Sequence, residues 1–273
     1  VGTIIVDPMT VGGTLSPSVM ACAGNNSGTI YLSGDTGTIQ GWQYSTDGFN
    51  WISLTNTTDS LMYVNLSQTT YYRAIVLSGV CAPALYSSVD TITISPMTVA
   101  GTVMGSTATC EGTGSGNLTL TGYTGTIGTW ETSPDGITWT ANANTTATEA
   151  WSNPADTVYY HVIVTSPGCP SDTSTVGSII VYPKPVAGFT STTVCEGNPT
   201  VFTDATTIAS GGILFHSWDF GDNDASVGTN PSHTYAAPGV FNVSLVVISD
   251  HNCSDTANGI ATANALPSAT ITA

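Results

Sequence analysis

Positive charge is almost absent from this chain. Its 273 residues include 18 Asp and Glu but only 2 Lys and Arg, so the formal net charge is −16. The two basic residues, Arg73 and Lys184, are far apart in the sequence. Binding to nucleic acid or to an anionic membrane surface needs clustered Lys and Arg. We therefore expect no nucleic-acid partner and no docking on acidic lipid.

Charge of either sign is scarce, and long apolar runs are missing as well. Charged residues make up 7% of the chain, against about 25% in ordinary globular proteins. No run approaches the roughly 18 apolar residues that span a membrane, so we expect no direct membrane insertion. Hydrophobic residues nevertheless reach 41%, and the abundant Val, Ile, Thr, Tyr and Trp distinguish the chain from an acidic disordered segment. Folded domains with a neutral, Thr- and Ser-rich surface are expected.

No segment keeps the 3.6-residue period of a helix, whereas the two-residue period of strands is common. In YYRAIVLSG (71–79), Tyr72, Ala74 and Val76 fall on one face. Asp-Gly pairs at 47–48 and 135–136 predict hairpins in which Gly takes the left-handed conformation. Short strands with turns about every 8–12 residues are typical of a β-sandwich. We therefore predict an all-β protein built from immunoglobulin-like β-sandwich domains.

The chain repeats itself at a fixed offset that carries position 34 onto position 122. GDTGTIQGWQYSTDGFNW (34–51) aligns without gaps with GYTGTIGTWETSPDGITW (122–139), and Cys22 aligns with Cys110. Such fixed-period similarity indicates a tandem array. We predict that the middle-strand residues of the two copies, Trp42 and Trp130, are buried in the cores. We expect Trp51 and Trp139 to be half exposed and packed, although an aromatic ligand platform is the alternative.

Prolines mark the predicted domain boundaries. Val1 to Pro8 aligns with Val89 to Pro96, the end of the first complete repeat. Proline fixes φ and holds its predecessor in extended geometry, so the linkers should be stiff and the array rod-like. We expect both ends to be cut from a longer tandem chain. The predicted units are 1–8, the last strand of a preceding repeat; 9–95 and 96–183, two immunoglobulin-like repeats; 184–266, a different domain; and 267–273, the start of a following domain.

Six cysteines form three pairs with nearly constant spacing. The pairs are Cys22/Cys81, Cys110/Cys169 and Cys195/Cys253, and their separations in sequence are the same to within one position. Constant spacing with one pair per domain points to disulfides and an oxidising compartment. In a standard immunoglobulin sandwich, however, these two positions lie at opposite ends. We expect pairing within each domain; the alternative crosses between domains and joins Cys81 to Cys110 and Cys169 to Cys195.

The third unit resembles the PKD domain, an immunoglobulin-like module of extracellular proteins. The matching residues are Trp218-Asp219-Phe220-Gly221-Asp222, Asn230-Pro231-Ser232-His233-Thr234-Tyr235, Gly239, and the strand FNVSLVV (241–247). Asn223 stands where the family usually has Gly, and Phe241 where it usually has Tyr. The resemblance implies a third sandwich. Alternation around Asp219 agrees with it, because Trp218 and Phe220 fall on one face of a strand.

The two repeats resemble immunoglobulin-like repeats of very large Bacteroidota surface proteins, including gliding-motility adhesins and appendages exported by the type IX route. The shared features are C-x-G at 22–24 and 110–112, W-x-x-S-x-D-G at 42–48 and 130–136, and a Tyr-Tyr pair before the late cysteine. The resemblance implies an extracellular, cell-surface location.

Candidate catalytic residues are lacking. His161, His216, His233 and His251 have no recognisable nucleophile partner, and no known catalytic motif is present. We expect no catalytic residue, no enzyme activity and no organic cofactor.

Asp219, Asp222 and Asp224 form the one dense carboxylate cluster. Calcium takes several carboxylate and carbonyl oxygens, so these residues are the candidate metal ligands. A solvated turn with Asx hydrogen bonds is the favoured alternative.

These observations predict a structural segment of a long extracellular filament or adhesin, which acts as a rigid spacer and assembly surface in attachment, gliding or capture of other cells. We expect self-association into filaments or bundles. One alternative is a module that binds a glycan or protein on another cell through Trp51 or Trp139. Another is a set of accessory domains of a larger secreted hydrolase.

Overall fold

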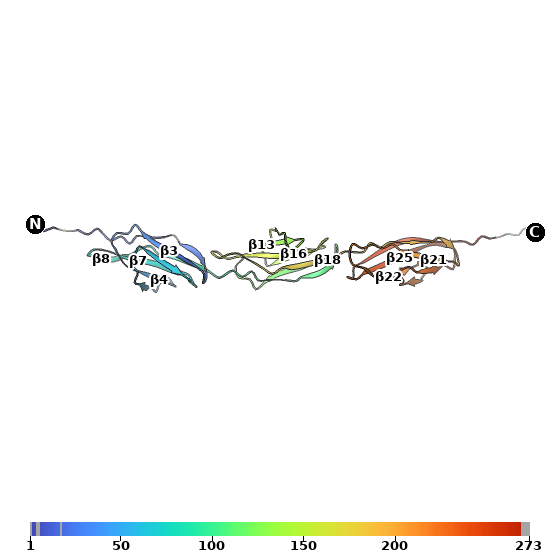
Figure 1. The fold of residues 1–273 in the computed structure, drawn as a ribbon, viewed down its shortest axis with the longest axis horizontal. Helices are drawn as coiled ribbons and strands as arrows, with labels where there is room; N and C mark the ends of the chain where they lie inside the picture. The colour runs from blue at the N-terminus through green and yellow to red at the C-terminus, as the bar shows by residue number, and fades with distance from the viewer. Residues whose placement is uncertain (1, 4–5, 17, 269–273) are drawn as a thin grey trace, which may run out of the picture.

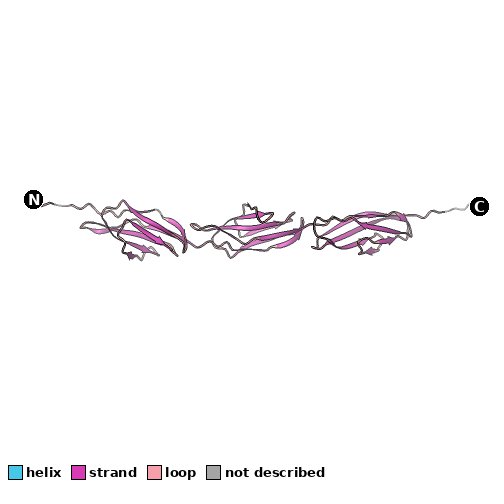
Figure 2. Ribbon diagram, viewed as in Figure 1, coloured by secondary structure: helices cyan, strands magenta, loops and turns pink. Residues whose placement is uncertain are grey.

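The computed structural model describes residues 2–3, 6–16 and 18–268, and it leaves the side chain of Cys81 outside the description. Three β-sandwiches follow one another in a row in chain order, with the first and the third at its two ends (Figure 1). The described residues contain strands, turns and loops but no helix (Figure 2). No apolar helix of membrane-spanning length is therefore found among them. The predicted all-β tandem architecture is confirmed.

Repeat 1 consists of two facing sheets. The larger has the order β2-β9-β7-β4-β5, with β8 added on β7, and the smaller has the order β1-β3-β6. The strands are β1 (Thr14–Leu15), β2 (Val19–Cys22), β3 (Ser27–Ser33), β4 (Thr38–Ser45), β5 (Ile52–Leu54), β6 (Ser60–Val64), β7 (Thr70–Ser78), β8 (Cys81–Tyr86) and β9 (Asp90–Ser95).

Repeat 2 has the same topology, as its sequence similarity predicts. Its sheets have the orders β11-β18-β16-β13-β14, with β17 on β16, and β10-β12-β15. The strands are β10 (Thr102–Met104), β11 (Thr107–Cys110), β12 (Ser115–Thr121), β13 (Thr126–Ser133), β14 (Thr140–Ala141), β15 (Thr148–Ser152), β16 (Val158–Thr165), β17 (Asp172–Thr173) and β18 (Gly177–Tyr182).

The third domain keeps this plan with one strand fewer. Its sheets are β20-β26-β25-β22-β23 and β19-β21-β24. The strands are β19 (Phe189–Ser191), β20 (Val194–Cys195), β21 (Pro199–Asp204), β22 (Ile213–Asp219), β23 (Ala225–Ser226), β24 (Ser232–Thr234), β25 (Gly239–Ser249) and β26 (Ser254–Asn264).

Each sandwich has its own core around one tryptophan. Trp42, Trp130 and Trp218 are 0%, 0% and 1% exposed. Each indole donates a hydrogen bond to a backbone carbonyl, at 2.8–2.9 Å, on the segment that crosses between the sheets. Burial of a tryptophan is favourable when its N–H finds such a partner. The predicted core positions of Trp42 and Trp130 are confirmed.

The W-x-x-S-x-D-G motif builds the hairpin after the core tryptophan. Ser45 donates to Asp47 Oδ1 at 2.9 Å and accepts from the Gly48 amide at 2.9 Å. Gly48 has φ +75°, a conformation that only Gly adopts without strain. Ser133, Asp135 and Gly136 repeat these contacts in the second copy, where Gly136 has φ +73°. The predicted left-handed glycines are confirmed.

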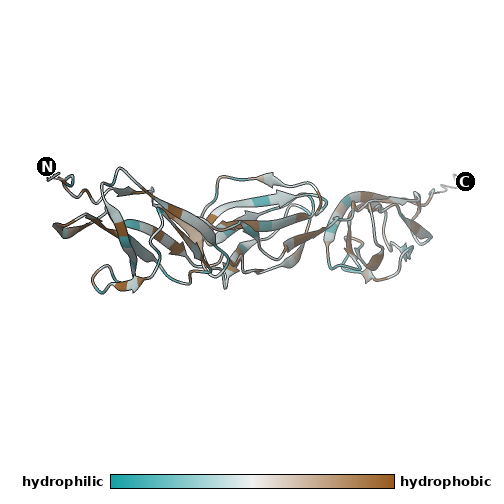
Figure 3. Ribbon diagram, turned by 60° about the vertical axis from the view of Figure 1, so that its left-hand side comes forward, coloured by the Kyte–Doolittle hydropathy of each residue, from teal (hydrophilic) through white to brown (hydrophobic). Residues whose placement is uncertain are grey.

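The ion pairs reflect the scarcity of Lys and Arg in the sequence. Most of the ribbon in Figure 3 is pale, with scattered brown and teal residues. Every ion pair formed within the described part of the chain has a histidine as its basic member. Salt bridges of Lys and Arg therefore play no part in the packing of these residues.

The predicted strands at the two ends fall partly outside the described residues, which lack positions 1, 4–5 and 269–273. The neighbouring described residues, 2–3, 6–8 and 267–268, are in no strand.

Candidate functional sites at the domain junctions

Both disulfides of the described chain join neighbouring domains. Cys22 of repeat 1 bonds to Cys169 of repeat 2, and Cys110 of repeat 2 bonds to Cys253 of the third domain. The prediction of pairing within domains is wrong. The alternative of pairing between domains is right in kind but wrong in its partners, because each early cysteine (Cys22, Cys110) bonds to the late cysteine of the following domain.

The early cysteine lies where its domain ends. The strand that carries it pairs in parallel with the last strand of the same sandwich, so that Cys22 lies opposite Ser95 and Cys110 opposite Tyr182. These partners are the last residues of β9 and β18. The linker to the next domain therefore begins beside the early cysteine.

The late cysteine lies where its domain begins. Cys169 is in the turn between β16 and β17, and Asp172, the first residue of β17, accepts a hydrogen bond at 3.0 Å from the amide of Ala100, near the start of repeat 2. Asp255, just after Cys253, accepts one at 2.8 Å from the amide of Ala187 in the same way. Because the start of one domain follows the end of another, the late and early cysteines of neighbours meet.

Further contacts accompany each disulfide. At the first junction, the turn that holds Cys169 lies against the backbone of β2 so closely that a Cβ added to Gly168 would come within 2.7 Å of Met20 and Ala21. Gly168 also has φ +75°, so both the close approach and the backbone conformation require glycine at this position.

At the second junction, the rings of Tyr182 and His251 stack with centroids 3.7 Å apart.

The two disulfides overlap along the chain, and this shortens the covalent path between domains. The backbone between Cys22 and Cys253 covers most of the chain, but the path through both disulfides includes only the segment from Cys110 to Cys169. At about 3.6 Å per extended residue, the maximal span falls from roughly 830 Å to roughly 210 Å. Stretching therefore meets a covalent limit even if a domain unfolds.

The structure divides the candidate calcium cluster. Asp222 and Asp224 lie together with His233, their possible ligand atoms all within 4.8 Å of one another. Asp219 instead accepts a hydrogen bond from the Gly221 amide at 2.8 Å. His233 bonds to Asp222 Oδ2 at 2.7 Å and stacks on Phe220. Calcium takes oxygen ligands, whereas the imidazole of His233 offers nitrogen. The calcium site stays a prediction.

One face of each half-exposed tryptophan is covered by a neighbouring side chain. The Arg73 guanidinium lies 4.0 Å from the centre of the Trp51 ring, and the His161 ring stacks on Trp139 at 3.7 Å. Arg73 and His161 are themselves held by hydrogen bonds to Gln43 and Glu131, the equivalent residues of the two copies. These contacts show tryptophans packed against the sheet on one side.

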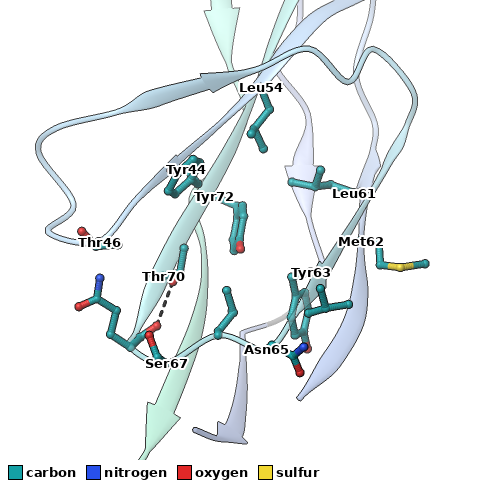
Figure 4. Close-up of a pocket in the computed structure, with 13 residues that line it drawn as sticks. Tyr44, Thr46, Leu54, Leu61, Met62, Tyr63, Asn65, Ser67, Thr70 and Tyr72 are labelled. Atoms are coloured by element: carbon teal, nitrogen blue, oxygen red, sulfur yellow. Dashed lines mark hydrogen bonds between the residues drawn. The ribbon is translucent and has the colours of Figure 1, made fainter. Parts of the chain in front are cut away.

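A groove at one end of repeat 1 is lined by aromatic side chains. It has a volume of about 360 Å³, and Tyr44, Leu61, Tyr63 and Tyr72 are among its lining residues. Figure 4 shows Tyr44 and Tyr72 entering it from β4 and β7, whereas Met62 points away. Burial raises the pKa of Tyr72 to about 12. The sequence signal was the alternation that places Tyr72 on one face of its strand; Tyr44 meets Tyr72 only through the pairing of β4 with β7.

Comparison with known proteins places the two repeats in one family. A family model described as a domain of unknown function (DUF8696) matches residues 11–96 and 99–183, more than half of the chain. The chain belongs to the DUF8696 family. A second model, described as a PKD domain, matches residues 182–263. The DUF8696 chain thus carries two copies of its family domain followed by a PKD domain, as the resemblance of 184–266 implies. No curated protein shows significant similarity to this chain.

Some of the similar solved structures cover about a third of the chain, and others cover nearly all of it. The PKD1 domain of the Vibrio cholerae metalloprotease PrtV is 28% identical over 30% of this chain and 98% of its own, with a TM-score of 0.28. The PKD1 domain of Vibrio anguillarum Epp is 25% identical over 30% and 96%, with a TM-score of 0.29. A Ca²⁺-stabilized adhesin that helps an Antarctic bacterium reach out and bind ice is 12% identical over 94% and 74%, with a TM-score of 0.38.

Proposed function

We propose that this chain is a force-bearing spacer segment of an extracellular filament or adhesin, and that it has no enzymatic activity. The observation that carries the proposal is the covalent connection of each sandwich to the next by a disulfide. A disulfide within a domain would stabilise that domain alone. A disulfide between domains maintains their relative placement and limits their separation under load.

The same disulfides support the extracellular location that we propose. Disulfides persist in oxidising compartments outside the cytosol, and PKD and immunoglobulin-like domains in a row suit a surface appendage. We further propose attachment of a distal tip to other cells, export by the type IX route of Bacteroidota and side-by-side bundling. Bundling is favoured because only 7% of the residues of the chain are charged, so that side-by-side contact has little charge to desolvate.

Single-molecule stretching of the chain from its two ends tests the proposal. With both disulfides intact, we expect the extension released on full unfolding to be well under half of that after reduction, because only the segment between Cys110 and Cys169 then lies on the path from Cys22 to Cys253. Equal extension before and after reduction would overturn the force-bearing role. A chain with Cys195→Ser is the matched control and should behave like the original.

A binding module is the second candidate, and the tyrosine-lined groove of repeat 1 favours it. Repeat 2 has Thr132 and Trp151 at the positions of Tyr44 and Tyr63, so the groove distinguishes the two copies. A glycan array with the folded chain and with Tyr44→Thr tests this candidate. Binding that this substitution abolishes would favour recognition over spacing.

A further inference from the structure

Cys195 is a free cysteine among the described residues, although its two counterparts are both in disulfides. It is half-buried, at the end of β20. β20 pairs in parallel with β26, so that Cys195 lies opposite Asn264, the last residue of that strand. Cys22 opposite Ser95 and Cys110 opposite Tyr182 have the same register. Cys195 therefore lies where its domain ends, as the bonded early cysteines do.

The turn after Cys195 also matches those after the bonded cysteines. Each early cysteine begins a Cys-x-Gly turn, and the glycines have φ of +74°, +66° and +78° in chain order. The residue after the cysteine donates to the carbonyl of the last residue of the paired strand in each domain: Ala23 to Ser95, Glu111 to Tyr182 and Glu196 to Asn264, at 3.0, 2.8 and 2.8 Å. The backbone around Cys195 is thus built like the two disulfide positions, in a domain that matches a different family model.

We propose that Cys195 is the attachment point of a further sandwich domain, whose late cysteine forms a disulfide with it across a third junction. Such a domain would be reached from Asn264, beside Cys195. Its late cysteine should follow Asn264 by about the separations seen at the other junctions, where Cys169 follows Ser95 by 74 residues and Cys253 follows Tyr182 by 71. The inference rests on cysteine register and stands whether or not the chain is a spacer.

The bond-forming step is an oxidation. The Cys195 thiol and the incoming thiol lose two protons and two electrons as the S–S bond forms, and a disulfide oxidant accepts the electrons and is reduced to two thiols. In the test, oxidised glutathione is that oxidant. Exchange proceeds through a mixed disulfide that the second thiol resolves. Placement of the second thiol beside Cys195 favours resolution over release.

The test extends the chain at Asn264 with a second copy of residues 96–183, so that a late cysteine follows Asn264 at the same separation at which Cys169 follows Ser95. The early cysteine of the added copy is changed to Ser. The protein is folded in a reduced and oxidised glutathione buffer and digested without reduction, and the peptides are mapped by mass spectrometry. Cys22–Cys169 and Cys110–Cys253 serve as positive controls in the same digest.

The expected result is a linked peptide that contains Cys195 and the late cysteine of the added copy, together with loss of thiol labelling at Cys195. In the extended chain with Cys195→Ser, the added late cysteine should become labelled. A Cys195 that remains a free thiol or a glutathione adduct while both controls form would overturn the inference. So would pairing of Cys195 with Cys81 of a second molecule, because it would make the cysteine a contact between chains.

Discussion

At the scale of single residues, the paired tryptophans of each repeat differ in what surrounds them. Trp42 is fully buried and donates to the Thr58 carbonyl, whereas Trp51 is half-buried beneath Arg73. In the sequence, Trp42 and Trp51 both align with a tryptophan of the second repeat, so the repeat alone does not distinguish their surroundings. The burial of Trp42 was predicted from its place in the middle strand of the repeat, but the cover over Trp51 depends on a strand pairing that the local sequence does not show.

Substitution of the two tryptophans by alanine should lower the stability of repeat 1 by different amounts. We expect Trp42→Ala to destabilise repeat 1 by about 3–5 kcal/mol, because it leaves a large cavity and an unpaired carbonyl. Trp51→Ala should cost about 1 kcal/mol or less, the value of a partly exposed cation–π contact. Urea unfolding followed by intrinsic fluorescence measures both. Equal losses for the two variants would contradict the assignment of Trp42 to the core.

The pKa values of two aspartates of repeat 1, Asp47 and Asp90, are shifted in opposite directions by their surroundings. Hydrogen bonds from Asn50, Phe49 and Ser45 hold the pKa of Asp47 well below its usual range. The fold therefore gains stability from Asp47 above the unfolded pKa of about 3.9 and loses it as pH falls toward the lower folded value. Carboxyl titration by NMR should show this depressed pKa, and Asp47→Asn should remove the corresponding acid-dependent loss of stability.

Burial raises the pKa of Asp90, one of whose oxygens has no hydrogen-bond partner. The dependence of stability on pH is therefore opposite to that of Asp47. The fold favours the protonated form, so the stability contributed by this group is present below about pH 3.9 and is lost as pH rises through the raised folded pKa. The same NMR titration should find a higher pKa for Asp90 than for Asp47. A lower pKa for Asp90 than for Asp47 would contradict both environments.

At the scale of elements, the parallel pairing of β2 with β9 and of β11 with β18 decides where the early cysteines lie. The constant spacing of the cysteines was equally consistent with a disulfide within the domain. Strand alternation and turn motifs are local properties, and they predicted the sandwiches. The direction in which an early strand pairs is a nonlocal property, and the disulfide partners follow from it.

Removal of one junction disulfide should loosen the row without unfolding its domains. The chain-entropy estimate for the 143-residue loop closed by Cys110–Cys253 is about 5 kcal/mol, but the loop spans two domains with separate cores, so each domain should lose much less. We expect Cys253→Ser to broaden the distribution of interdomain distances in small-angle scattering and to leave the strand content unchanged. Cys195→Ser is the control. An unchanged distribution for Cys253→Ser would show that noncovalent contacts such as the Tyr182–His251 stack suffice.

The calcium prediction concerns the turn between β22 and β23. If Asp222 and Asp224 bind calcium, millimolar calcium should raise the melting temperature of the third domain, and Asp224→Asn should abolish the rise. Asp219→Asn, which changes a carboxylate bonded to a backbone amide, is the matched control. Calorimetry with and without a chelator measures the shift. No shift in the original chain would end the calcium hypothesis.

At the scale of the whole molecule, three similar sandwiches form a row, because each domain meets the next at its ends (Figure 1). The prolines at 96, 183 and 185 restrict the linkers, and the overlapping disulfides add a covalent limit to extension. Stiffness of the row was expected from the prolines alone. The staggered cysteine connections make neighbouring domains mechanically dependent, which no linker composition indicates.

The sequence by itself determined the repeat, the all-β class, the core tryptophans and the Asp-Gly hairpins, because these depend on residues close together in the chain or on the period of the pattern. Only the tertiary structure decided which cysteines meet, which tryptophan faces are covered and which aspartates cluster with His233. Those outcomes depend on how strands pair and on how one domain follows another. Identical cysteine spacing is compatible with several such arrangements, and packing of the junctions selects among them.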